Sequence, residues 1–107
     1  MKDVTVIVDR PLGSSHPDFP QLRYPVNYGY VPGTMAGDGE EQDAYILGVS
    51  QPVERFTGKL LAVISRSNDA EEKWVVVPDG VRLTEKEIME QVAFQEQYFH
   101  SNLIMLD

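Results

Sequence analysis

The segment from Asp38 to Asp43, with the sequence DGEEQD, places four carboxylates within six residues. Gly39 allows a tight bend after the first of them. Carboxylates this close repel one another, and a bound divalent cation relieves the repulsion. Because carboxylate oxygens without thiolates favour Mg²⁺ or Mn²⁺ over Zn²⁺, the segment is a candidate magnesium site. A solvated acidic turn is the alternative interpretation.

Three tyrosines stand just before this acidic segment, in the sequence YPVNYGY. Tyr24, Tyr28 and Tyr30 have even spacing, so on an extended backbone they share one face. Each buried hydroxyl needs a hydrogen-bond partner, and three of them exceed what an ordinary core uses. The hydroxyls could donate to phosphate oxygens or orient a metal-bound water. A tyrosine-rich sheet surface is the alternative.

A third charged cluster, RSNDAEEK at residues 66–73, lies between two predicted strands. Its charged side chains are Arg66, Asp69, Glu71, Glu72 and Lys73. A loop that returned these acids and the lysine toward the DGEEQD segment would complete a metal and phosphate site. A charged hairpin tip is the alternative.

Strands separated by short turns must position these clusters. β-Branched and aromatic residues between turn residues predict strands at residues 4–8, 26–31, 43–49, 59–65 and 73–78. Pro-Gly, Asp-Gly and Ser-Asn-Asp sequences separate them. Short strands with short connections favour a meander or a small barrel. The predicted fold class is therefore mainly β with a C-terminal helix (α+β).

A capping box formed by Thr84 and Glu87 predicts the start of that helix. One apolar stripe at helical spacing contains Ile88, Val92 and Phe99, with Met89 at its margin. Phe94 and Tyr98 lie away from this stripe. Tyr98 is therefore expected to meet something other than the main core, and Phe94 is a candidate for an oligomer interface.

The composition predicts one soluble domain spanning residues 1–107. Of the 107 residues, 42% are apolar, which is enough for one modest core. No run approaches the roughly 18 apolar residues that a membrane helix requires, so we expect a soluble, cytoplasmic protein. The absence of cysteine excludes disulfides, thiolate zinc sites and cysteine nucleophiles.

The net charge of −8 argues against nucleic-acid and anionic-membrane partners. It also disfavours a phosphate-bearing ligand unless divalent cations reverse the local field. The two histidines, His16 and His100, have no partner at i+3 or i+4, which argues against a histidine metal site.

The YPVNYGY and DGEEQD segments together resemble the soluble family I inorganic pyrophosphatases, which combine a similar tyrosine segment with an Asp-Gly-Asp-Pro-x-Asp signature. The resemblance continues through RSNDAEEKWVVVP to FQEQYF and covers residues 24–100. It implies a small five-stranded OB-like barrel, Mg²⁺ (or Mn²⁺) as cofactor, and hydrolysis of pyrophosphate to phosphate.

The resemblance also implies site residues at matching positions. The implied metal ligands are Asp38, Glu40, Asp43 and Glu71. The implied catalytic residues are Asp43, Tyr28 near the nucleophilic water, and Lys73. The implied phosphate-binding residues are Tyr24, Lys73 and Tyr98. Contact with the product phosphate would explain why Tyr98 lies off the apolar stripe.

The sequence departs from the family pattern on its phosphate-binding side. Family members are longer and carry, before the tyrosine segment, a hairpin that supplies a lysine, a glutamate and an arginine. Here DRPLGSSHPDFPQLR, residues 9–23, replaces that hairpin, and Arg10 and Arg23 are the candidate substitutes. Arg66 stands where a metal-binding aspartate belongs, and Phe99 where a lysine belongs.

Two functional hypotheses are compatible with these residues. The first is a Mg²⁺-dependent hydrolase of pyrophosphate or of another phosphorylated compound. The second is a degenerate, non-catalytic family member that binds metal and phosphate or a protein partner, because losing phosphate-clamping cations costs orders of magnitude in rate. A small barrel also gains stability by burying an exposed face, so a homo-oligomer is a further expectation.

Overall fold

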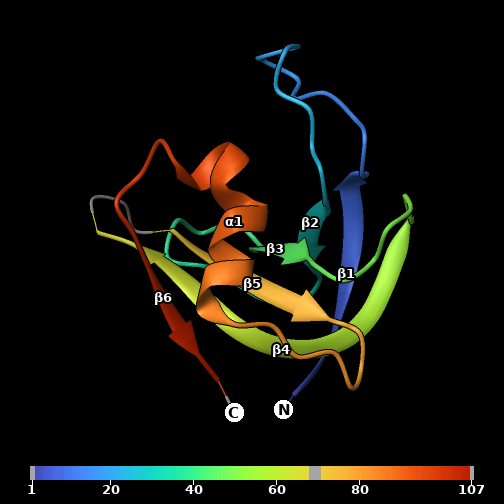
Figure 1. The fold of residues 1–107 in the computed structure, drawn as a ribbon, viewed down its shortest axis with the longest axis vertical. Helices are drawn as coiled ribbons and strands as arrows, with labels where there is room; N and C mark the ends of the chain where they lie inside the picture. The colour runs from blue at the N-terminus through green and yellow to red at the C-terminus, as the bar shows by residue number, and fades with distance from the viewer. Residues whose placement is uncertain (1, 68–70, 107) are drawn as a thin grey trace.

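Six strands and one helix make up the regular structure of residues 2–67 and 71–106, the part of the chain that the computed structural model describes (Figure 1). They are, in chain order, β1 (Asp3–Arg10), β2 (Asn27–Val31), β3 (Gln42–Ile46), β4 (Arg55–Arg66), β5 (Glu72–Val77), α1 (Glu85–Glu96) and β6 (Ser101–Met105). Each predicted strand overlaps one of the first five observed strands. In this described part, no helix has the length and apolar character needed to cross a membrane.

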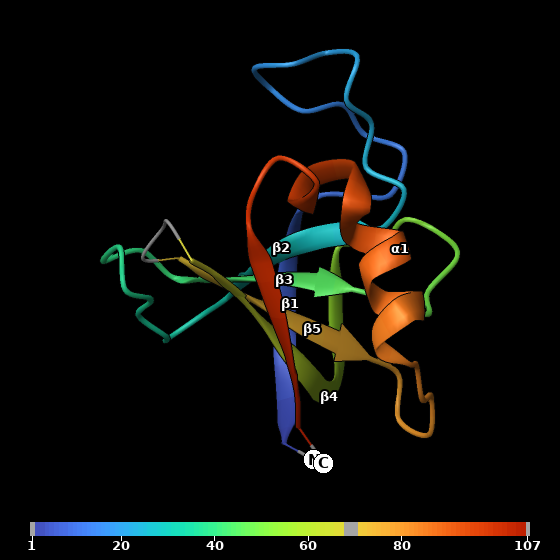
Figure 2. The same cartoon turned by 60° about the vertical axis from the view of Figure 1, so that its left-hand side comes forward.

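Five of the strands close into a barrel (Figures 1 and 2). Neighbouring strands follow the order β1, β2, β3, β5, β4, and β4 pairs back to β1 through residues 55–59. β3 and β5 are parallel, and the other pairs are antiparallel. The predicted five-stranded barrel is confirmed. β6 was not predicted; it pairs with residues 62–66 of β4, beyond the part that closes the barrel.

The long strand β4 begins at Arg55, four residues before the predicted strand at 59–65. The sequence pattern begins later than the strand itself because Gly58 interrupts the run of strand-forming residues. A Cβ atom at Gly58 would lie 2.3 Å from the carbonyl oxygen of Val77 on β5. Only glycine therefore allows β5 to approach β4 at this point. The requirement comes from the partner strand, which local sequence does not reveal.

Alternate residues of the strands divide between two apolar clusters, as the two-residue period of a strand requires. On β3, Tyr45 and Leu47 just after it belong to the cluster that includes Ile88 and Val92 of α1. Ala44 and Ile46 belong to a second cluster, with Val4, Val6, Val31, Leu60 and Val76. The helix α1 thus packs against one side of the β3–β5 region, and its last turn lies near one end of the barrel.

The predicted capping box at the start of α1 is confirmed. The Glu87 N–H donates to Thr84 Oγ1 at 3.1 Å, and the Thr84 N–H donates to Glu87 Oε1 at 2.9 Å. The predicted burial of Ile88 and Val92 is also confirmed. Phe99 was wrongly assigned to the helical stripe, because α1 ends at Glu96 and the chain turns toward β6.

Phe94, predicted as a candidate for an oligomer interface, is partly buried against the core of its own chain. Its ring packs edge-on against Tyr24 and Tyr45, with ring centroids 5.2 and 6.0 Å apart. The barrel tyrosines are long enough to reach a second face of α1, beyond the stripe of aliphatic residues. Phe94 therefore packs against the core, and its role in an oligomer interface stays a prediction.

Replacing Thr84 by alanine is expected to lower the free energy of unfolding by about 1 kcal/mol, because it removes the acceptor for an unpaired helix N–H. Urea unfolding followed by circular dichroism measures the loss. Thr84→Ser keeps the acceptor and should retain most of the stability. Equal stability of the alanine variant and the unchanged protein would contradict a stabilising role for this cap.

Candidate functional site

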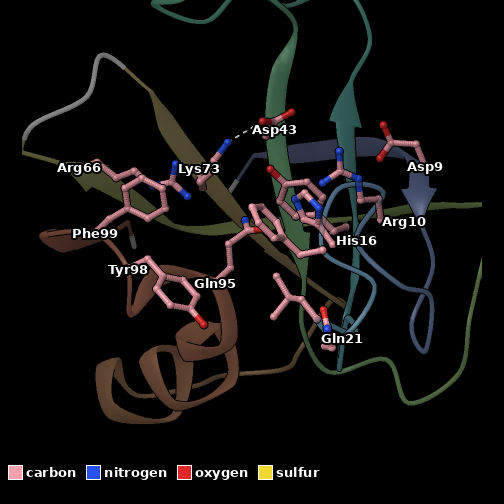
Figure 3. Close-up of a pocket in the computed structure, with 13 residues that line it drawn as sticks. Asp9, Arg10, His16, Gln21, Asp43, Arg66, Lys73, Gln95, Tyr98 and Phe99 are labelled. Carbon is pink, nitrogen blue, oxygen red and sulfur yellow. Dashed lines mark hydrogen bonds and ion pairs between the residues drawn. The ribbon is translucent and has the colours of Figure 1, made fainter.

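A cavity of about 730 Å³ opens between one end of the barrel, the segment that joins β1 to β2, and the end of α1 (Figure 3). Its charged lining residues are Asp9, Arg10, Asp43, Arg66 and Lys73. Its ring-bearing lining residues are His16, Phe19, Tyr28, Tyr98 and Phe99. The cavity therefore combines charges of both signs with aromatic walls.

The segment of residues 11–26, called the β1–β2 loop below, forms one wall of this cavity. Its two arms are joined by a hydrogen bond from the His16 N–H to the Leu22 carbonyl at 2.8 Å. At its base the buried Asn27 accepts a hydrogen bond from the Leu12 N–H at 2.9 Å. Figures 1 and 2 show the loop projecting from the barrel end at which α1 finishes.

Lys73 on β5 holds two carboxylates together at the cavity wall. The parallel pairing of β3 and β5 sets Asp43 opposite Lys73. The Lys73 ammonium donates to Asp43 Oδ2 at 2.6 Å and to Glu71 Oε1 at 2.9 Å. Burial disfavours the charge on Lys73, but the neighbouring Tyr28, Asp43 and Glu71 outweigh it and raise the lysine pKa above its usual value.

Arg66, at the end of β4, is buried and engaged by carboxylates. Its Nε and Nη2 atoms donate to the two carboxylate oxygens of Glu96 at 3.1 and 2.6 Å. Its Nη1 atom donates to Glu71 at 3.4 Å, and its guanidinium lies 3.7 Å from the centroid of the Phe99 ring. Burial would raise the pKa of Glu96, but hydrogen bonds from Arg66, Tyr45 and Ser101 lower it.

A chain of hydrogen bonds runs beneath the cavity from Arg10 to Glu96. Arg10 donates to the Tyr24 hydroxyl at 2.6 Å, and Tyr24 donates to the side-chain oxygen of Gln95 at 3.0 Å. The Gln95 amide donates to the Tyr45 hydroxyl at 2.8 Å, which donates to Glu96 at 2.6 Å. These bonds fix β1, α1 and β3 relative to one another and explain how buried hydroxyls are satisfied here.

Of the four side chains predicted as metal ligands, Asp43 and Glu71 come together around Lys73, and Asp38 and Glu40 lie apart from them. Asp43 lines the cavity, and Glu71 lies beside it on the other side of Lys73. Asp38 and Glu40 lie in the exposed turn of residues 32–41, which Figure 2 shows projecting from the barrel on the side away from α1. Across residues 2–67 and 71–106, no three His, Asp or Glu side chains are grouped to hold a metal. Asp69 lies outside the described residues.

The described carboxylates therefore do not fit a centre of several Mg²⁺ ions. Asp43 and Glu71 are already compensated by Lys73, and Glu71 also by Arg66. Asp38 accepts a hydrogen bond from the Glu40 N–H within its own turn, at 3.0 Å. A divalent cation at this wall would have to displace the Lys73 ammonium or be repelled by it.

The residues predicted to bind phosphate lie at different depths. Tyr24 is fully buried below the cavity and does not line it. Arg23 is exposed and donates to the Gly13 carbonyl, away from the lining. Tyr98 lines the cavity mouth with 70% of its surface exposed, and Figure 3 shows its hydroxyl directed away from the Asp43–Lys73 pair. Arg10 lines the cavity wall opposite Tyr98.

Sequence reasoning missed Gln95, Glu96 and Phe19 at this site. Glu96 is 2% exposed, whereas its position near a helix end predicts a solvated charge. The sequence feature that indicated a buried carboxylate was Arg66, which ends an apolar strand. A charge buried there needs a partner of opposite charge. Nothing in the local sequence identifies that partner as Glu96.

The sequence profile of the inorganic pyrophosphatase family matches residues 4–100. The chain is 34% identical over 80 residues to an inorganic pyrophosphatase of Xanthomonas campestris, an alignment that covers 68% of this chain and 40% of that protein. The chain therefore spans about two fifths of the length of this relative.

Solved structures of inorganic pyrophosphatases share the fold. The Ehrlichia chaffeensis protein superposes with a TM-score of 0.74 at 18% identity, covering 97% of this chain and 86% of the other. The Coxiella burnetii protein gives a TM-score of 0.70 at 20% identity, covering 97% and 83%. At these identities the similarity shows the architecture of the barrel and helix.

Proposed function

Because the chain belongs to the inorganic pyrophosphatase family, we propose that it hydrolyses inorganic pyrophosphate to phosphate in the cavity beside the β1–β2 loop. The observation that carries this proposal is the Asp43–Lys73 ion pair at the cavity wall, where Tyr28 also lines the cavity. These three side chains are the ones that the family resemblance implies as catalytic.

The proposed reaction adds water across the P–O–P bridge. The water oxygen forms a bond to one phosphorus, the bridging P–O bond breaks, and two phosphate ions form with release of one proton. Asp43 accepts that proton and the Tyr28 hydroxyl orients the water. Lys73 and Arg10 donate to phosphate oxygens on which negative charge accumulates.

Dependence on Mg²⁺ or Mn²⁺ stays a prediction from the resemblance. A bound divalent cation would neutralise phosphate oxygens and lower the pKa of a bound water. Since the described carboxylates do not fit such a centre, we assign no step to a metal. The assay below therefore includes a chelator as well as both metals.

A second candidate function is binding of phosphate compounds without turnover. It is favoured by the ion pairs of Lys73 with Asp43 and with Glu71, which occupy two of the carboxylates predicted as metal ligands. The other predictions from the sequence are compatible with both proposals and remain predictions. They are one domain, a cytoplasmic location, a homo-oligomer, and no nucleic-acid or membrane partner.

The test is phosphate release from pyrophosphate by the purified protein, measured in Mg²⁺, in Mn²⁺ and in EDTA. We expect release above a protein-free blank in at least one metal. Calorimetric titration with pyrophosphate is run in the same three buffers. Binding without release in any buffer would reject hydrolysis and support the second candidate.

A further inference from the structure

The cations of the cavity offer little free positive charge to a small anion. Lys73 is shared between Asp43 and Glu71, and Arg66 is engaged by Glu96 and Glu71. Of the lysine and arginine side chains that line the cavity, Arg10 alone forms no ion pair within residues 2–67 and 71–106. One guanidinium without an ion pair, which already donates to Tyr24, attracts a bare, highly charged anion weakly in a protein with a net charge of −8.

The size of the cavity admits a ligand larger than pyrophosphate. Its volume of about 730 Å³ falls in the range of roughly 300–1,000 Å³ typical of sites for drug-sized organic ligands. Such sites derive much of their binding free energy from apolar contact and use a few polar groups for orientation. Apolar contact can replace the electrostatic attraction that this cavity lacks.

The apolar lining is almost entirely aromatic. His16 and Phe19 come from the β1–β2 loop, Tyr98 and Phe99 follow α1, and Leu22 is the one aliphatic side chain among the described lining residues. Phe19 and Tyr98 keep 62% and 70% of their surface exposed, so their rings are accessible to a ligand. In Figure 3, His16 and Arg10 lie on one wall and Tyr98 and Phe99 on the other.

We propose that the ligand of this cavity is an organic diphosphate that carries a planar aromatic group, such as a nucleoside diphosphate. The diphosphate contacts Arg10 and Lys73, and the aromatic group stacks on the exposed rings of Phe19 and Tyr98. This inference rests on the proposed function for its site and for cleavage of a P–O–P bridge, and goes beyond it by naming an organic diphosphate as the preferred substrate over inorganic pyrophosphate.

Hydrolysis of such a ligand by the proposed reaction requires water as the only co-reactant. The water oxygen bonds to the terminal phosphorus and the bridging P–O bond breaks. The organic monophosphate leaves with the bridging oxygen, inorganic phosphate forms, and one proton passes to Asp43 and then to solvent.

The experiment compares calorimetric affinities of adenosine diphosphate, pyrophosphate and geranyl diphosphate, with and without Mg²⁺. We expect adenosine diphosphate to bind most tightly. Phe19→Ala should lower the ratio of adenosine diphosphate affinity to pyrophosphate affinity about tenfold, because it removes a stacking surface. Met35→Ala is the matched control, since Met35 is 80% exposed and does not line the cavity; its ratio should be unchanged.

The outcomes separate this inference from the proposed function. Tighter binding of pyrophosphate or of geranyl diphosphate than of adenosine diphosphate would overturn the inference. Equal ratios in Phe19→Ala and Met35→Ala would overturn it as well, and would favour a protein-binding role for the exposed rings. Phosphate release is assayed in parallel: tight binding of adenosine diphosphate without release from any substrate supports the inference and rejects hydrolysis.

Discussion

Replacing Glu96 by alanine is expected to lower the free energy of unfolding by about 3–5 kcal/mol, the usual cost of removing one partner from a buried ion pair. Arg66 has only 4% of its side chain exposed, so loss of its bidentate partner leaves a poorly solvated charge. The Tyr45 and Ser101 hydroxyls lose an acceptor at the same time. Because small domains have about 5–15 kcal/mol of stability in total, urea unfolding should show a large shift.

A double variant, Arg66→Met with Glu96→Leu, tests whether the loss arises from burying Arg66 without its Glu96 partner. Replacing both charges by apolar side chains is often nearly neutral, so we expect at least half of the loss to be recovered. A Glu96→Ala variant whose free energy of unfolding falls by less than about 1 kcal/mol would contradict the expected cost of breaking the buried Arg66–Glu96 ion pair.

The stability lost in Glu96→Ala is expected to decrease as the pH falls. The pKa of Glu96 is lowered in the folded protein, so the carboxylate stabilises the fold above the unfolded pKa of about 4.3. That stabilisation disappears as the pH falls through the lower folded pKa. The difference in unfolding free energy between Glu96→Ala and the unchanged protein should therefore shrink between neutral pH and about pH 3.

The elements that are visible in the sequence are those stabilised by their own residues. β1 and β5 are predictable because β-branched residues fill them between turn residues, and the start of α1 because Thr84 and Glu87 cap each other. β6 is a short strand of alternating burial with a polar start, and it exists because β4 extends past β1 and offers an edge. Its cause lies in the partner strand.

The same distinction applies to the candidate site. Asp43 and Lys73 were proposed from the family resemblance, and the register of β3 and β5 brings them into contact. Arg66 and Glu96 are 30 residues apart, and their pairing depends on where α1 ends over the barrel. Asp38 and Glu40 are close to Asp43 in sequence, yet the turn of residues 32–41 keeps them exposed and outside the cavity lining.

The Asp43→Asn variant is expected to lower kcat for phosphate release at least about 100-fold, because a positioned proton acceptor contributes roughly 10²–10⁴ in rate. Asparagine has nearly the same volume as aspartate, and Lys73 keeps its bond to Glu71 at 2.9 Å. The fold should therefore persist, which circular dichroism and thermal unfolding check. A loss confined to KM would assign Asp43 to substrate binding.

Two further aspartates make this result specific. Asp79 lies exposed in the turn after β5, so Asp79→Asn should leave kcat unchanged and controls for the loss of one negative charge. Asp38→Asn tests the metal interpretation, because Asp38 and Asp43 act together if both bind one metal cluster. We expect a much smaller loss at Asp38, since its carboxylate accepts a bond from its own exposed turn and does not line the cavity. Equal losses at Asp38 and Asp43 would instead require the turn of residues 32–41 to close on the cavity during turnover, with a metal between the two carboxylates.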